Sequence, residues 1–164
     1  MGDGGRAGQV RDDPVMGYVA DAFLGSLAEV VSAATGLTFA ALEGGVHRVG
    51  EGMVGAMGLY GGNRGILLIS AEEADLRLLS SRMTGTPPGD VTDADMGDTL
   101  CEIVNMTAGG AKLRLSGEED AFTLSMPFII TGQAMDVSFK GRAGVVAGRL
   151  GDGEASLSLR VMFH

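Results

Sequence analysis

The chain has 164 residues, enough for one ordinary domain but not for two independent ones. Hydrophobic residues make up 45% of the sequence, so a sizeable core can form. The formal net charge of −9 argues against binding to nucleic acid, which needs clustered lysine and arginine. One cysteine and two histidines are too few for a disulfide framework or a Cys/His zinc site, and they favour a cytoplasmic protein.

The amino-terminal segment, residues 1–13, is polar and rich in glycine, which predicts a flexible tail without the apolar core of a signal peptide. The longest apolar runs in the remainder, Met53–Tyr60 and Ile66–Ile69, are much shorter than the roughly 20 residues that a membrane span requires. We therefore expect neither secretion nor insertion into a membrane.

The first half of the domain begins with a predicted helix and continues into a β-hairpin. Apolar residues at helical spacing predict the helix from Pro14 to a stop at Gly36. Two short apolar runs, Met53–Tyr60 and Gly65–Ser70, are joined by a turn rich in glycine and asparagine. This pattern predicts a hairpin, because both residue types tolerate the positive φ angles of tight turns.

Two further helices are predicted from the spacing of capping boxes. Ser70 and Glu73 are three residues apart and predict a short second helix, while Thr92 and Asp95 predict a third helix that runs to about Leu113. In such a box each residue satisfies a backbone N–H at the start of the helix that would otherwise lack a partner. Both helices should therefore begin sharply.

The remaining sequence predicts strands. Four are expected, with a tight glycine-containing turn between the last two: Thr123–Ile130, Met135–Lys140, Gly144–Leu150 and Ser156–Phe163. The last strand alternates apolar and mostly polar residues, which is typical of a sheet with one covered and one exposed face. The fold class is therefore α+β (mixed α/β), an antiparallel sheet with two long helices packed on one side.

An internal sequence repeat relates the first and third helices. A shift of 73 residues pairs residues of the same type: Glu29 with Glu102, Gly36 with Gly109 and, past the helix, Met53 with Met126. This predicts a single pseudo-twofold domain over residues 14–164, built from related halves of about 14–86 and 87–164. The alternative is that two amphipathic helices align only through their apolar positions.

The third helix carries a polar edge. At about 100° per residue, six residues project to one side: Asp95, Asp98, Glu102, Asn105, Gly109 and Lys112. Glu102 and Asn105 are three apart, with Cβ atoms about 5–6 Å from each other, so they can act together on one small target. Gly109 would let a partner's backbone approach closely. Acidic residues at the start of this helix are expected from the helix dipole, so no metal site is predicted.

This edge resembles the active helix of the CheC/CheX/FliY family of bacterial chemotaxis phosphatases. The family signature is a Glu and an Asn three apart followed by a Gly-x-Ala-Lys segment, matched here by residues 102–112, EIVNMTAGGAK. CheX-type members are most similar, because the first copy has Ser32 where an Asn would be needed. One departure is Gly110, at a position where the family often has Asn.

The resemblance implies a phosphatase that hydrolyses the aspartyl phosphate of a CheY-like response-regulator receiver domain. Asn105 would orient the attacking water and Glu102 would dock the receiver, with Asp98, Gly109 and Lys112 as further partner-binding positions. No cofactor of its own is implied, since the receiver supplies Mg²⁺. The alternative is a non-catalytic module that docks a receiver or a flagellar switch protein. CheX relatives also imply a homodimer, which could form through the last strand if that strand lies at an edge.

Overall fold

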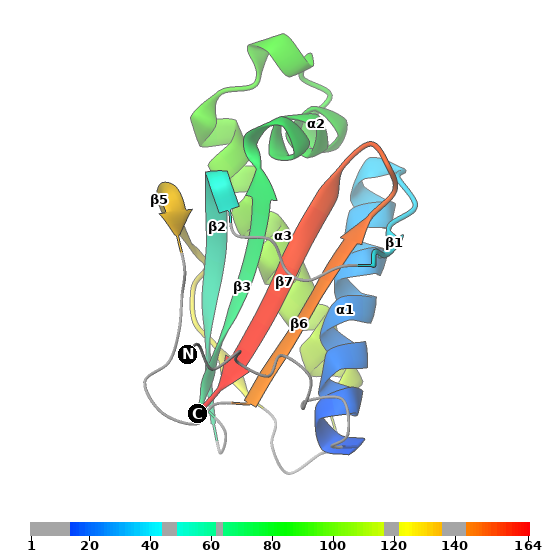
Figure 1. Cartoon of the computed structure of the whole chain (residues 1–164), viewed down its shortest axis with the longest axis vertical. Coiled ribbons are helices and arrows are strands. Elements are labelled where there is room, and N and C mark those ends of the chain that lie inside the picture. Colours follow the sequence, from blue (N-terminus) through cyan, green and yellow to red (C-terminus); the bar gives the residue numbers. More distant parts are fainter. Residues whose placement is uncertain (1–13, 44–48, 62–63, 117–121, 136–143) are drawn as a thin grey trace, which may run out of the picture.

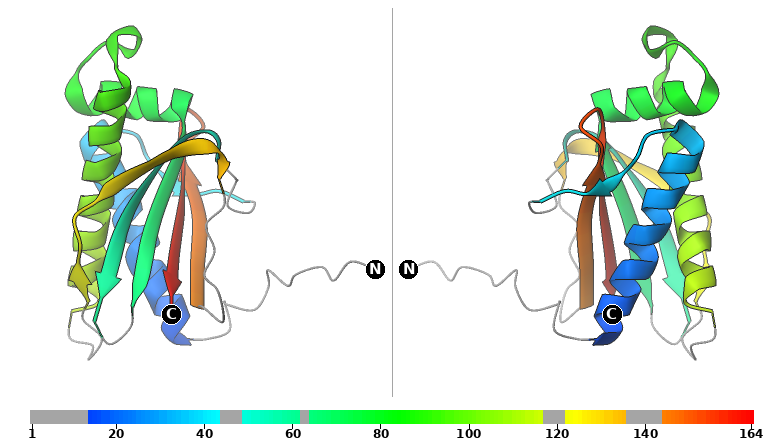
Figure 2. Two further views of the ribbon diagram at one scale, coloured as in Figure 1. Left: turned by 90° about the vertical axis from the view of Figure 1, so that its left-hand side faces the viewer. Right: turned by 90° about the vertical axis from the view of Figure 1, so that its right-hand side faces the viewer.

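The computed structural model describes residues 14–43, 49–61, 64–116, 122–135 and 144–164. Its elements are, in chain order, α1 (Pro14–Thr35), β1 (Ala40–Ala41), β2 (Val49–Tyr60), β3 (Gly65–Glu72), α2 (Glu73–Thr84), the 3₁₀ turn η1 (Pro88–Asp90), α3 (Asp93–Arg114), β4 (Thr123–Leu124), β5 (Phe128–Met135), β6 (Gly144–Gly151) and β7 (Ser156–Phe163). The strands form one antiparallel sheet, α1 and α3 lie side by side on one face of it, and α2 crosses one end (Figures 1 and 2). The predicted fold class is confirmed.

The sheet has a pseudo-twofold topology. Its strand order is β1-β6-β7-β3-β2, and the far side of β2 pairs with β4 and β5. The two hairpins, β2–β3 and β6–β7, meet through β3 and β7 at the centre of the sheet. Each half also gives a strand to the other, because β1 pairs with β6 and β5 pairs with β2. Exchanging the halves therefore leaves this order unchanged.

The shift of 73 residues holds for the helices and fails beyond them. Phe23 and Leu27 of α1 are buried, as are Met96 and Leu100 at the shifted positions of α3. Met126, which the shift predicts to begin a strand, instead lies between β4 and β5 and is 84% exposed. The two halves thus share packing positions and topology without a constant sequence offset.

The predicted strand Thr123–Ile130 is two strands, β4 and β5, separated by residues 125–127. Pro127 lies in this break, where its lack of an N–H prevents a continuous ladder. The break is held to β2 by Ser125, whose N–H donates to the carbonyl of Gly58 and whose Oγ accepts from the N–H of Gly58. Of the predicted strand Met135–Lys140 only Met135 is described, at the end of β5, and the rest lies outside the described residues.

The predicted capping box of Ser70 and Glu73 is wrong. Ser70 lies inside β3, paired with Val54 of β2 on one side and Ser158 of β7 on the other. The strand therefore continues to Glu72, which occupies the N-cap position of α2 without a side-chain capping bond. Sheet pairing on both sides outweighs a cap that contributes only about 1 kcal/mol.

The core lies between the sheet and the helices, as the alternation of β7 predicts: Leu157, Leu159 and Val161 are all buried there. The opposite face of β7 is not exposed as expected, since Ser158 and Met162 are also buried. This second face carries a smaller apolar cluster of Val54, Ala56, Leu68 and Met162. Because β7 lies between β3 and β6, it is not an edge strand, so a dimer cannot form by edge pairing of this strand. The homodimer itself stays a prediction.

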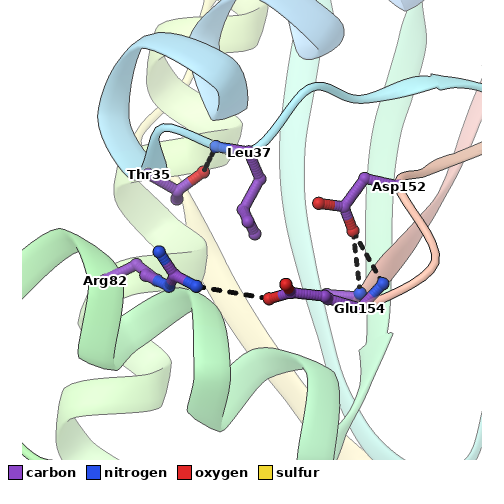
Figure 3. A network of polar contacts seen from close by, with 6 residues as sticks. Thr35, Leu37, Arg82, Asp152 and Glu154 are labelled. Carbon is purple, nitrogen blue, oxygen red and sulfur yellow. Dashed lines mark hydrogen bonds and ion pairs between the residues drawn. The ribbon is translucent and has the colours of Figure 1, made fainter.

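Polar contacts fix α2 over the end of the sheet (Figure 3). Arg82 of α2 pairs with Glu154 in the β6–β7 turn at 3.2 Å, and Asp152 accepts hydrogen bonds there from two backbone N–H groups. Asp75 of α2 accepts from the N–H and the hydroxyl of Ser156 at the start of β7. The chain that leaves α2 passes through η1 before α3 begins, and Arg77 of α2 donates a hydrogen bond to the carbonyl of Val91 just before that helix, so α2 helps to place its start.

Helix α1 is more apolar than the sequence analysis allowed. By length and composition Val15–Thr35 would suffice to cross a membrane, with a mean hydropathy of 1.3. Core helices of soluble proteins pass the same test, and this one contributes Phe23, Leu27 and Val31 to the core. Only 28% of its apolar window is buried, so packing against α3 and the sheet accounts for these core positions and not for the apolar character of the whole helix.

Candidate active site on helix α3

The start of α3 is fixed by the predicted capping box. Thr92 Oγ1 accepts a hydrogen bond from the N–H of Asp95 at 3.2 Å, and Asp95 Oδ2 accepts from the N–H of Thr92 at 2.8 Å. The bond from the Thr92 N–H, and then the bond that the Thr92 hydroxyl donates to the same Oδ2, lower the pKa of the Asp95 carboxyl below its usual value. Because the first turn is held in this way, the rotation of every later residue around the helix axis is set.

The buried side of α3 packs closely on the sheet. A Cβ atom added at Gly55 of β2 would lie 2.7 Å from Val104 Cγ2 and 2.9 Å from Leu100 Cγ. Glycine at this position therefore lets the helix approach the strand, and Leu100, Ile103 and Val104 are fully buried. The side of the helix opposite this contact is left to solvent.

The α3 edge, which we define as Asp98, Glu102, Asn105, Gly109 and Lys112, lies on that solvent side. The side chains of Asp98, Glu102 and Asn105 are exposed, while Gly109 and Lys112 are half-buried. The structure thus brings all five predicted positions to one surface, although their functional roles stay predictions. Asp95 projects to the same side, but its carboxylate is committed to the cap.

Glu102 and Asn105 are available to another molecule. Within the part of the chain that the structure describes, no hydrogen bond or ion pair is recorded for either side chain, nor does any loop cover them. An exposed carboxylate can pair with a cation, and an exposed carboxamide offers both a donor and an acceptor. Together they can hold a charged group and a water molecule of a docked partner.

The adjacent glycines of α3 have different surroundings. A Cβ atom at Gly110 would overlap Ser26 Oγ of α1 and would lie 3.3 Å from Ser26 Cβ, so this glycine allows α1 and α3 to pack closely. A Cβ atom at Gly109 would meet nothing within 4 Å. Close packing of the two helices thus explains Gly110, including its departure from the family pattern, but it does not explain Gly109.

The corresponding positions of α1 are occupied by structural contacts. Glu29, the counterpart of Glu102, forms a 2.6 Å ion pair with Arg114 in the last turn of α3. Ser32, the counterpart of Asn105, accepts a hydrogen bond from the N–H of Phe39 through its Oγ. In the first copy the acid is therefore in an ion pair and the amide is missing, while its lack of a catalytic role stays a prediction.

Helix α3 also carries a cysteine and several acidic residues. Partial burial, and then the charge of Asp98, raise the pKa of the Cys101 thiol, which disfavours the reactive thiolate. Among the described residues, no group of three or more His, Cys, Asp or Glu side chains could hold a metal ion.

Two apolar residues beside the α3 edge were missed in the sequence analysis. Met106 is half-buried, and Leu113 is 76% exposed although it is a large hydrophobic residue. Helical spacing alone would have placed both next to Gly109, since they lie three residues before it and four after it. They were missed because the apolar residues of this helix were expected to lie in the core.

Comparison with known proteins places these features in a family. The family model for the chemotaxis phosphatase CheX matches residues 53–148, a span that includes all of α3. No curated protein matches the chain.

Several solved structures share the fold. The chemotaxis protein CheX from Vibrio vulnificus has a TM-score of 0.78 at 22% identity, over 89% of this chain and 96% of that one. A CheX–CheY–BeF₃–Mg²⁺ complex from Borrelia burgdorferi gives 0.70 at 18% identity, over 88% and 96%. FliY from Thermotoga maritima gives 0.67 at 16% identity, over 96% and 91%. With the fold shared and more than half of the chain matched by the family model, this protein belongs to the chemotaxis phosphatase CheX family.

Proposed function

We propose that this protein hydrolyses the aspartyl phosphate of a CheY-like receiver domain, using Asn105 and Glu102 of α3. The observation that carries the proposal is the simultaneous exposure of these two side chains, three residues apart on a helix whose opposite side is buried. Membership of a phosphatase family supports the reaction class. The complex of the Borrelia burgdorferi relative supports a CheY-type partner.

The chemistry requires little beyond accurate positioning. An acyl phosphate is already activated, so the phosphatase needs neither a nucleophile of its own nor a covalent intermediate. The Asn105 carboxamide can accept a hydrogen bond from a water molecule and donate one toward a phosphoryl oxygen, which would hold the water in line for attack. The products are inorganic phosphate and the free aspartate of the receiver.

Glu102 has a separate role in this proposal. Its carboxylate would pair with a lysine of the receiver's active site, so that Asn105 enters beside the phosphoryl group in a fixed register. The Mg²⁺ would belong to the receiver and would neutralise charge on the phosphoryl oxygens. This division predicts different kinetic effects for the two residues.

The proposal is tested with a CheY-type receiver domain of the source organism that has been phosphorylated by acetyl phosphate. Asn105→Ala should lower the catalysed rate of phosphate release about 100-fold while the receiver still binds. Glu102→Ala should chiefly weaken binding to the receiver carrying beryllofluoride and Mg²⁺ as a phosphoryl mimic. Glu29→Ala, at the equivalent position of α1, is the matched control and should leave the rate unchanged.

Full activity of Asn105→Ala would refute the catalytic role. A wild-type protein that binds the activated receiver but never accelerates phosphate release would instead identify the non-catalytic docking module. That module has no need of a water-orienting amide beside its acid, so the presence of Asn105 favours the enzyme.

A further inference from the structure

Gly109 is a residue of α3 whose identity is not explained by packing. A Cβ atom there would meet nothing within 4 Å, whereas the glycine beside it, Gly110, is needed for the contact with Ser26 of α1. Glycine is also a poor helix former, so alanine would be favoured at an interior helix position with open space around it. The reason for a glycine at position 109 therefore lies outside the packing of the core.

The backbone conformation does not supply that reason either. In the internal repeat Gly109 corresponds to Gly36, which follows the last residue of α1 with a φ of 75°, a left-handed conformation that favours glycine. Gly109 lies inside α3 instead, with an ordinary helical backbone. A residue with a side chain could adopt the same backbone at this position.

Helix geometry relates Gly109 to Asn105. The two positions are four residues apart, so they are separated by about 6 Å along the helix axis and by about 40° around it. Side chains of an α-helix lean toward its amino terminus, so each one covers the surface of the residues three and four positions earlier. Within α3, the residues that can cover Asn105 in this way are therefore those at positions 108 and 109.

Both of these positions have the smallest possible residues. Ala108 is fully buried in the core, so its small size is explained by packing. Gly109 is half-buried, and Asn105 one turn before it is exposed, with no hydrogen bond to its carboxamide from the described residues. A long side chain at position 109 would lie over the Asn105 carboxamide and would occupy the space in which it turns.

We propose that Gly109 is a positioning residue that keeps the Asn105 carboxamide uncovered. The inference rests on the proposed function, but it concerns contacts within this chain and not the docking of the receiver. In that function the carboxamide accepts a hydrogen bond from the attacking water and donates one toward a phosphoryl oxygen, so both of its polar atoms have to be free. Catalysis by positioning is sensitive to small displacements, since a shift of about 1 Å can lower a rate about 100-fold.

The test replaces Gly109 by methionine, a good helix former with a long, unbranched side chain. Gly109→Met should raise the midpoint of urea unfolding by about 0.3–0.5 M. It should lower kcat about tenfold, measured with the phosphorylated receiver at saturation so that weaker docking alone has no effect. Gly109→Ala should raise the midpoint similarly but lower kcat much less, because a methyl group there reaches no neighbouring atom. A merely structural role would not give a protein that is more stable and yet slower.

The same contact can be followed in the free protein. The NMR signals of the Asn105 side-chain amide, identified by their loss in Asn105→Ala, should shift in Gly109→Met. Gly25→Met is the matched control, because it changes another interior helix glycine with open space at its Cβ position, on α1. This control should alter neither the Asn105 signals nor kcat, and an equal loss of kcat in it would overturn the inference.

The outcomes distinguish this inference from the proposed function. If the wild-type protein dephosphorylates the receiver and Gly109→Met does so with unchanged kcat, the inference is wrong and the proposed function stands. A loss of receiver affinity without a loss of kcat would likewise overturn it. Unchanged Asn105 amide signals in Gly109→Met would refute it without any receiver. If the wild-type protein dephosphorylates no CheY-type receiver of the source organism, both fail.

Discussion

Replacing Gly110 by alanine should destabilise the protein, whereas the same change at Gly109 should stabilise it. Alanine is favoured over glycine inside a helix by about 1 kcal/mol, and this term applies equally to both positions. At Gly109 nothing opposes it, because the space that the methyl group would occupy is open. Gly109→Ala should therefore raise the free energy of unfolding by about 1 kcal/mol.

The cost at Gly110 comes from the contact between α1 and α3. The new methyl group would overlap Ser26 Oγ, which donates a 2.9 Å hydrogen bond to the carbonyl of Thr107. Ser26 is 1% exposed, so its hydroxyl has no solvent to turn toward. Overpacking of this kind costs about 1–3 kcal/mol, and a displaced buried hydroxyl costs about 1–3 kcal/mol more. After the helix term is subtracted, a net loss of about 2 kcal/mol is expected.

The two variants should thus differ by about 3 kcal/mol, and because helix propensity cancels in the comparison, the difference measures packing alone. Urea unfolding followed by far-ultraviolet circular dichroism would show it as a separation of about 1.5 M between midpoints, for a slope of about 2 kcal/mol/M. Adding Ser26→Ala to Gly110→Ala removes the overlapping oxygen and should recover part of the loss. Equal midpoints for the two glycine variants, or strict additivity of the Ser26 change, would refute the reasoning.

Two further predictions concern the same helix. Thr107 Oγ1 is buried and, within the described residues, without a hydrogen-bond partner, so Thr107→Val should raise the free energy of unfolding by about 1 kcal/mol, and a loss in urea unfolding would contradict this. The pKa of Asp95 is lowered by its capping bonds, so its carboxylate stabilises the fold above the unfolded-state pKa of about 4, and this contribution is lost as the pH falls through the lower folded-state pKa. The stability difference between wild type and Asp95→Asn should therefore be present at neutral pH and shrink in acid, whereas parallel pH profiles would exclude this role.

Elements with strong local signals were predicted well. Thr92 and Asp95 fix the start of α3 through contacts within one turn, and Gly36, with a φ of 75°, follows the last residue of α1 as expected. The hairpin of β2 and β3 was also predicted, because its turn residues and apolar runs are adjacent in sequence. In each case the residues that decide the structure lie close together along the chain.

Predictions failed where distant segments decide. The spacing of Ser70 and Glu73 is that of a cap, but pairing with both β2 and β7 extends the strand through Ser70. The central position of β7 depends on the whole strand order, which no periodicity within the strand reveals. The short strand β1 was missed because its two residues are defined only by pairing with β6.

The candidate site shows the same division. Spacing alone correctly placed Glu102 and Asn105 together on an exposed surface, since helix geometry determines it. Spacing could not distinguish Gly109 from Gly110, which are adjacent in the sequence and both lack side chains. Their difference depends on Ser26 of α1, far away in the sequence, and becomes visible only when the two helices are packed together.

The pairing of α1 and α3 also distinguishes the two copies of the repeated helix. Arg114 reaches from the end of α3 to Glu29 of α1, and Tyr18 of α1 donates a 2.7 Å hydrogen bond to the carbonyl of Arg114. The Glu29 side chain is 76% exposed, so its ion pair contributes only about 0–1 kcal/mol to the contact between the two helices. Position 32 holds a serine, whose Oγ accepts a hydrogen bond from the N–H of Phe39, so the first copy lacks the carboxamide as well. The two copies of the helix therefore differ in what surrounds the acid: Glu29 lies against Arg114, whereas Glu102 has no ion-pair partner among the described residues.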